Sequence, residues 1–186
     1  EECGAGAGIK SQGAYALATG FRDLGLDSGR FFILDVCGRG DTLVISTTVD
    51  SILKQEEGPA AQKSLRKIRN LRSAALEAAR DANIQNTLLL PTPFSDDAGF
   101  LAAGLSAQTI SMLPEKEAKD LASLVRRQPA LASLMINRDA RKTESCMNPD
   151  WYPETWNLIN SEADTRETLT AGSSHLVQRL IQYLIP

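Results

Sequence analysis

The sequence predicts an α/β fold: a three-layer sandwich in which a central, mostly parallel sheet carries helices on both faces. Three observations support this prediction. Predicted strands alternate with predicted helices along the chain. Residues 30–37 and 87–90 are apolar at consecutive positions, which is typical of strands that are buried on both faces. Residues 59–82 have the periodicity of a long amphipathic helix.

The composition fits one globular domain. A chain of 186 residues with 42% hydrophobic and 23% charged residues can bury a core without disulfide or metal staples. Disordered, collagen-like and coiled-coil chains are excluded. The net charge of -3 argues against a dedicated nucleic-acid binder. No apolar run approaches the roughly 18 residues that a membrane span requires. The oligomeric state stays open.

The first third of the chain predicts one helix and two strands. A glycine-rich turn at 3–8 precedes a helix that begins with Ser11 as its N-cap and ends at Gly25. Residues 30–37 form the first strand, and the β-branched residues 42–49 form the second.

The helix at 59–82 begins near Pro59, which the first turn of a helix tolerates. Its polar face carries Lys and Arg side chains, which are either simply solvated or bind an anionic partner. A buried strand follows at 87–90, then a short helix at 98–103 and a strand at 106–112.

The last third predicts three helical pieces. Residues 114–142 form two of them, separated at Pro129, and residues 173–184 form the final helix, while 143–157 are irregular. His175, the only histidine, falls within the final helix, where an ordinary surface or packing role is expected. Histidine-based catalysis and metal binding therefore have little support.

Three cysteines, Cys3, Cys37 and Cys146, have spacings that fit no zinc motif. We expect free thiols, although a bridge between Cys3 and Cys37 is open if their segments are neighbours.

Four acidic or polar clusters lie at the ends of predicted strands. They are Glu1-Glu2, Asp35, residues 95–97 and residues 160–165. In an open α/β sheet, ligands bind at the carboxyl ends of strands. Carboxylates there can hold zinc, and an adjacent Glu pair suits metal-assisted hydrolysis, with one residue on the metal and one as the base.

The order of these clusters carries a family resemblance. It reads Glu-Glu-x-Gly, then Ile-Leu-Asp-Val-x-Gly, then Pro-Phe-Ser-Asp-Asp-x-x-Phe-x-x-x-Gly-Leu-x-Ala, then Asn-Ser-x-x-Asp-Thr. This series resembles the zinc aminopeptidases, a family that includes bacterial leucyl aminopeptidases and relatives of glutamate carboxypeptidase and glutaminyl cyclase. The resemblance spans nearly the whole chain but only the second half of a family domain.

The resemblance implies a role for each matched residue. Glu1 matches the general base, and Glu2, Asp35 and Asn160 fall at positions of zinc ligands. Asp164 is expected to brace the loop before the final helix. The implied function is a zinc-dependent exopeptidase, similar to an aminopeptidase, or a related amide hydrolase that acts on a peptide or small amide.

The resemblance also implies a domain organisation. Residues 1–186 would be one domain that lacks its N-terminal part, and residues 113–157 would be an insertion. The insertion's aromatic residues Trp151, Tyr152 and Trp156 either line a substrate cleft or pack in the core. Most relatives are secreted or periplasmic, but the sequence leaves the compartment open.

The sequence departs from the family pattern at two positions. Asn160 and Asp97 both stand where the family has histidine. Because an amide is a poor zinc ligand, we expect this chain to bind zinc weakly or not at all. Three hypotheses follow: a metal-dependent exopeptidase, a non-catalytic relative that serves as a binding module, or an α/β domain whose acidic clusters are coincidental.

Overall fold

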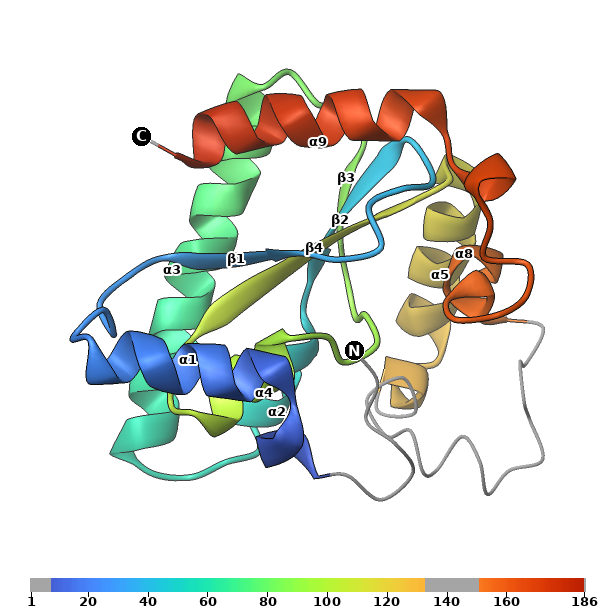
Figure 1. Ribbon diagram of the computed structural model, residues 1–186. Coiled ribbons are helices and arrows are strands. Elements are labelled where there is room, and N and C mark those ends of the chain that lie inside the picture. Colours follow the sequence, from blue (N-terminus) through green and yellow to red (C-terminus); the bar gives the residue numbers. More distant parts are fainter. Residues whose placement is uncertain (1–7, 133–150, 186) are drawn as a thin grey trace.

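The computed structural model describes residues 8–132 and 151–185, and it has an α/β fold around a mixed sheet (Figure 1). The strands are β1 (Phe31–Leu34), β2 (Thr42–Ser46), β3 (Thr87–Leu90) and β4 (Ala107–Leu113). Their order across the sheet is β1-β4-β2-β3. The two outer pairs, β1 with β4 and β2 with β3, are parallel, whereas the central pair of β2 and β4 is antiparallel.

The main helices lie close to the predicted positions. They are α1 (Gly13–Asp23), α3 (Pro59–Asp81), α5 (Glu115–Arg127) and α9 (Ala171–Leu184). Ser11 is not the N-cap of α1, because it closes the short 3-10 turn η1 (Ile9–Ser11) and its hydroxyl donates to the carbonyl of Gly8. Gly25 follows the end of α1 with a φ of 72°, a conformation that glycine adopts without strain.

The shorter helices mark the differences from prediction. They are α2 (Thr48–Leu53), α4 (Asp97–Ala102), α8 (Glu154–Leu158) and the 3-10 turn η2 (Arg166–Thr168). The predicted strand at 42–49 ends at Ser46, because hydrogen bonds of Thr48 to Thr92 replace the sheet ladder and a helical turn begins. In the predicted insertion, residues 133–150 lie outside the described residues.

One face of the sheet packs against α3 and α9. Leu43 and Ile45 of β2 and their neighbours on β4 contact small residues of α3 and leucines of α9. The intervening residue of β2, Val44, points the other way and packs with residues of α5 and α8. Because side chains alternate along a strand, these two clusters lie on opposite sides of β2. A third cluster joins α1 and α4 to the β1 side of the sheet.

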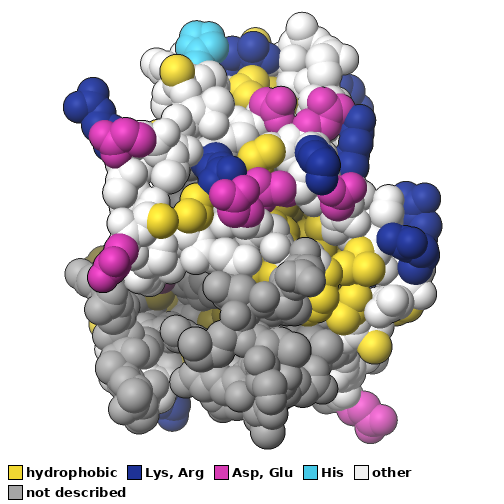
Figure 2. Space-filling view, turned by 90° about the vertical axis from the view of Figure 1, so that its right-hand side faces the viewer, with side chains coloured by type: hydrophobic (Ala, Val, Ile, Leu, Met, Phe, Trp, Pro, Cys, Tyr) yellow, Lys and Arg dark blue, Asp and Glu magenta, His cyan; other side chains and the backbone are white. Residues whose placement is uncertain are grey.

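The aromatic residues near α8 belong to the core. Trp156 is 4% exposed and packs with Val44, and Tyr152 contacts both Trp151 and Trp156 at ring-centroid distances of 5.8 and 5.7 Å. Of the two roles left open by the sequence, the structure assigns core packing. On this side of the molecule, which holds α5 and α8, acidic and basic side chains are interspersed (Figure 2).

The turn after β1 ties the sheet to α5 and α8. Arg39 lies 3.2 Å from the carboxylate of Glu154 and 3.6 Å from that of Glu117. Gly40 has a φ of 110°, and a side chain there would collide with the backbone of Leu113. Only glycine fits this close approach.

No helix among the described residues is long and apolar enough to cross a membrane.

Candidate functional site

Of the predicted site residues, Glu1 and Glu2 lie outside the described residues. Asp35 directly follows β1, and its backbone N–H donates to the carbonyl of Ile110 on β4. Its side chain is half-buried.

Asn160 lies in the exposed loop between α8 and η2. Its φ of 58° places it in the left-handed region, which asparagine tolerates better than most residues. Its backbone N–H donates to the carboxylate of Asp164 at 3.2 Å. This contact is a local backbone hydrogen bond of the kind expected for Asp164, and its effect on stability stays a prediction.

The described residues do not supply a zinc site by themselves. No group of three His, Cys, Asp or Glu side chains that could hold a metal occurs within residues 8–132 and 151–185. The described members of the predicted set are a carboxylate, Asp35, and an amide, Asn160, and these donors fit zinc poorly without an imidazole or thiolate. As matched zinc ligands, Glu2, Asp35 and Asn160 are expected to meet in one pocket at the edge of the sheet, and this stays a prediction.

Asp97, from the third matched motif, is a buried carboxylate at the start of α4. It is 1% exposed, and one of its oxygens accepts a hydrogen bond from the backbone N–H of Ser95 at 3.1 Å. The side chain of Thr109 on β4 also hydrogen-bonds to the Asp97 carboxylate and favours its charged form.

Burial is the main cause of a raised pKa at Asp97, and the negative charge of Asp35 raises that pKa further. Hydrogen bonding from Thr109 and from backbone N–H groups opposes the increase without cancelling it. The register explains how the two aspartates come near each other. Thr109 of β4 pairs with Ile33 of β1, so Asp35 follows two residues later on the same face of the sheet.

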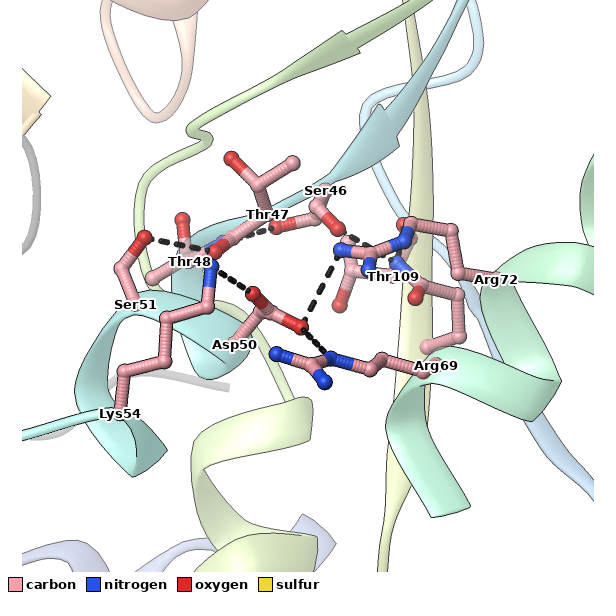
Figure 3. A network of polar contacts seen from close by, with 10 residues as sticks. Ser46, Thr47, Thr48, Asp50, Ser51, Lys54, Arg69, Arg72 and Thr109 are labelled. Carbon is pink, nitrogen blue, oxygen red and sulfur yellow. Dashed lines mark hydrogen bonds and ion pairs between the residues drawn. The ribbon is translucent and has the colours of Figure 1, made fainter. Parts of the chain in front are cut away.

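A second buried aspartate, Asp50 on α2, has the opposite surroundings (Figure 3). It is 3% exposed, and its carboxylate lies 2.6 Å from the ammonium of Lys54, 3.3 Å from the guanidinium of Arg72 and 3.5 Å from that of Arg69. Burial alone would raise the pKa of Asp50, but the Lys54 hydrogen bond and the three positive charges outweigh it and lower the pKa. This contact set joins α2 to α3.

Buried hydroxyls connect Asp50's helix to the strand ends. Thr92 donates from its hydroxyl to that of Ser46 at 2.7 Å, and the hydroxyl of Thr48 donates to the carbonyl of Thr92 at 2.6 Å. On the adjacent strand, the side-chain amide of Gln108 donates to the carbonyls of Ser46 and Thr109, both at 2.9 Å. The ends of β2 and β3 and the start of β4 are thus fixed together.

Sequence reasoning missed the role of Asp50. It treated the basic face of α3 as solvated or as a surface for an anionic partner, whereas Arg69 and Arg72 have a partner within the chain. Their spacing of three residues on one face was the available signal. No acidic partner was assigned to these two arginines, because Asp50 was expected to follow directly after the predicted strand at 42–49, which is longer than β2.

The described residues include two further candidates for a nucleophile or base, Cys37 and His175, and neither lies in a site. Burial, followed by the charge of Asp35, raises the pKa of the Cys37 thiol to about 12, so the thiol is not reactive near neutral pH. Cys37 is a free cysteine, while Cys3 and Cys146 lie outside the described residues. His175 is exposed on α9, as an ordinary surface histidine would be.

Comparison with known proteins adds no relative: no family model matches the chain, and no curated protein or solved structure matches it significantly.

Proposed function

We propose that this chain is part of an aminopeptidase-like hydrolase that acts on a peptide or a small amide. The observation that carries the proposal is the proximity of Asp35 and Asp97. They belong to two motifs of the zinc aminopeptidase pattern that are far apart in the sequence, and they lie on adjacent elements: Asp35 follows β1, β1 pairs with β4, and β4 packs against α4, which begins at Asp97. Buried carboxyl groups with raised pKa values concentrate at functional sites.

The finer architecture belongs to the same proposal. A three-layer sandwich with a mostly parallel sheet, similar to the zinc exopeptidases, would contain the four described strands as part of its sheet. In this arrangement Asp35 and Asn160 would face the site together with Glu2, and Glu1 would act as a base. The described donors do not fit zinc, so no catalytic step is assigned to a metal here.

Asn160 favours a second candidate, a non-catalytic relative that binds peptides. The residue occupies a left-handed position in a loop that Asp164 braces through the backbone. Asparagine is well suited to this backbone conformation, so its presence has a structural explanation that requires no metal. A protein of this kind would keep the peptide-binding surface and lose hydrolysis.

Titration calorimetry with zinc, paired with hydrolysis of a leucyl anilide, tests the first candidate. Zinc binding tighter than about micromolar, which corresponds to roughly 8 kcal/mol of binding free energy, together with hydrolysis would support the hydrolase against the weak binding that its described donors predict. Asp35→Ala should abolish both zinc binding and hydrolysis. Glu57→Gln, which changes an exposed carboxylate between α2 and α3, should alter neither and serves as the matched control.

The same samples separate the two candidates. Binding of a non-hydrolysed leucyl peptide without zinc binding or hydrolysis supports the binding module. If zinc, the anilide and the peptide all fail to bind, both candidates are wrong and the acidic motifs are coincidental.

A further inference from the structure

We propose that the open edge of β1 binds an extended peptide of another polypeptide as an added strand, with a carboxylate of that peptide on Arg30. The peptide has apolar side chains at alternate positions and an acidic residue at its C-terminal end. The proposed surface is the edge of the sheet rather than the carboxyl ends of its strands. It is therefore independent of the hydrolase function proposed above.

The first support is the hydrogen-bonding capacity of β1. Within the described residues, β1 is an outer strand of the sheet and pairs only with β4. The backbone N–H of Asp35 donates to Ile110 on β4. Because backbone groups alternate in direction along a strand, those of Phe32 and Leu34 point to the open edge. Each of these two residues offers an N–H and a C=O group there, and an extended chain matches their spacing.

The second support is a groove beside this edge, between β1 and the C-terminal end of α9 (Figure 1). It has a volume of about 550 Å³ and is lined by Arg30, Phe32, Leu34, Ile181, Leu184 and Ile185. Leu34 is 38% exposed and Ile185 is 68% exposed. Outer strands are commonly protected by charge, proline or a bulge, whereas every residue of β1 is apolar. An added strand with apolar side chains on the groove face would cover this surface.

The charge beside the groove selects an acidic partner. Arg30 is exposed, and no carboxylate within residues 8–132 and 151–185 forms an ion pair with it. Its guanidinium donates to the carbonyl of Leu184 at 3.4 Å and keeps further N–H groups that can hold a carboxylate. Arg30 directly precedes β1, so a peptide that pairs antiparallel with β1 brings its C-terminal end to this arginine.

A second copy of the chain fits this edge less well. In an antiparallel pair, residues whose backbone groups face the partner strand lie opposite each other, so Phe32 of one copy would face Phe32 or Leu34 of the other. In these two registers Leu34 and Val36, respectively, would lie opposite Arg30, and neither is acidic. A separate peptide with an acidic residue supplies the charge that a second copy lacks.

Fluorescence anisotropy with a fluorescein-labelled, C-terminally amidated peptide, Thr-Val-Thr-Val-Thr-Glu, tests the proposal. Its valines and its glutamate fall on one face of an extended strand. The unaltered chain should bind this peptide. N-methylation of one alternate set of its amides should weaken binding by about tenfold or more, the effect of losing at least one hydrogen bond. N-methylation of the other set should preserve binding, because only one edge of the peptide faces β1.

Variants of the chain locate the binding surface. Leu34→Lys should weaken binding by about tenfold or more, because it removes an apolar wall and places a charge on the edge. Leu89→Lys is the matched control: it changes a leucine that is 45% exposed on the other outer strand, β3, and should bind like the unaltered chain. Arg30→Ala should weaken binding about two- to fivefold, the range of an exposed ion pair, and should bind glutamate and glutamine peptides equally.

Ile185→Ser changes an exposed position after α9 and covers the case in which Leu34→Lys fails to fold. It should weaken binding by about threefold or more. The proposal is overturned if the peptide does not bind at about 1 mM, or if Leu34→Lys and Ile185→Ser both bind like Leu89→Lys. It is also wrong if light scattering finds a dimer that Leu34→Lys converts to a monomer, because a second copy then occupies the edge. Zinc binding and anilide hydrolysis in Asp35→Ala test the hydrolase proposal separately.

Discussion

Asp50 and Asp97 are both buried at the start of short helices that follow strand ends, but their environments are opposite. Three cationic side chains surround Asp50, and its pKa is lowered despite burial. Asp97 has another carboxylate nearby, and its pKa is raised mainly by burial. Two aspartate side chains of similar exposure thus differ in their effect on stability. The charged form of Asp50 stabilises the fold, whereas the charged form of Asp97 is disfavoured in it.

The difference separates a structural role from a functional one. An ion-pair centre such as Asp50 stabilises the contact between α2 and α3, and breaking it leaves buried charge without a partner. A buried carboxyl group such as Asp97, which has no cationic partner within residues 8–132 and 151–185, reduces stability at neutral pH and persists where it has another use. Three experiments test this comparison, and a fourth measures the effect of an exposed aspartate, Asp164.

The largest effect is expected from Asp50→Ala. Removing the carboxylate leaves Arg72, which is 18% exposed, without its counter-charge, and should lower the free energy of unfolding by about 2–4 kcal/mol. Urea denaturation measures this change. Asp81→Ala, which removes an exposed partner of Arg80, is the control and should cost less than about 1 kcal/mol. Equal losses in both variants would contradict the central role of Asp50.

The pH dependence of stability should have two opposite limbs. A raised pKa at Asp97 makes the folded state take up a proton before the unfolded state, so stability increases as pH falls from neutral toward about 4. The pKa of Asp50 is lowered in the folded state, so its ion pairs contribute fully to the free energy of unfolding above about pH 4. This contribution is lost as the pH falls through the folded-state pKa of Asp50. Denaturation midpoints across pH 2–8 (roughly the window of both groups) should show a maximum between the limbs.

Asp97→Asn should raise the free energy of unfolding at pH 7 in metal-free buffer by about 1 kcal/mol, because the amide carries no buried charge. Asp97→Asn should also remove the increase in stability that occurs as the pH falls from neutral toward about 4. Asp50→Asn should remove the loss of stability at lower pH. If Asp97→Asn is strongly destabilising in EDTA, Asp97 is a compensated structural group and the comparison fails.

The smallest effect is expected from Asp164→Ala. Its carboxylate accepts one exposed backbone hydrogen bond, from Asn160, so the loss should be about 0.5–1 kcal/mol. Asp164→Asn, which retains an acceptor oxygen, should recover most of it. An unchanged denaturation midpoint in Asp164→Ala would show that the contact does not stabilise the loop.

Local patterns in the sequence predicted α3, β3 and the final helix well, because long apolar periodicity and flanking prolines are local signals. The α/β class is likewise confirmed. The start of α2 was missed because the β-branched Thr47, Thr48 and Val49 have strand propensity, and only the hydrogen bonds of Thr48 to Thr92 override it.

The candidate site was less accessible from the sequence. The motifs identified Asp35 and placed Asp97 among them, but the burial of Asp97 depends on how β4 and α4 pack in three dimensions. Two of the three counter-charges of Asp50, Arg69 and Arg72, come from α3, which begins nine residues later, and only the packing of α2 against α3 pairs them with Asp50.

The mixed sheet has a consequence for how the chain folds during synthesis. Each strand pair joins segments that a helix or more separates, and β1 finds its partner only when Ala107 and the residues after it have emerged. Helices such as α3 can form early from local contacts. In contrast, β1 can pair only after β4 has been synthesised, and its apolar residues stay exposed until then.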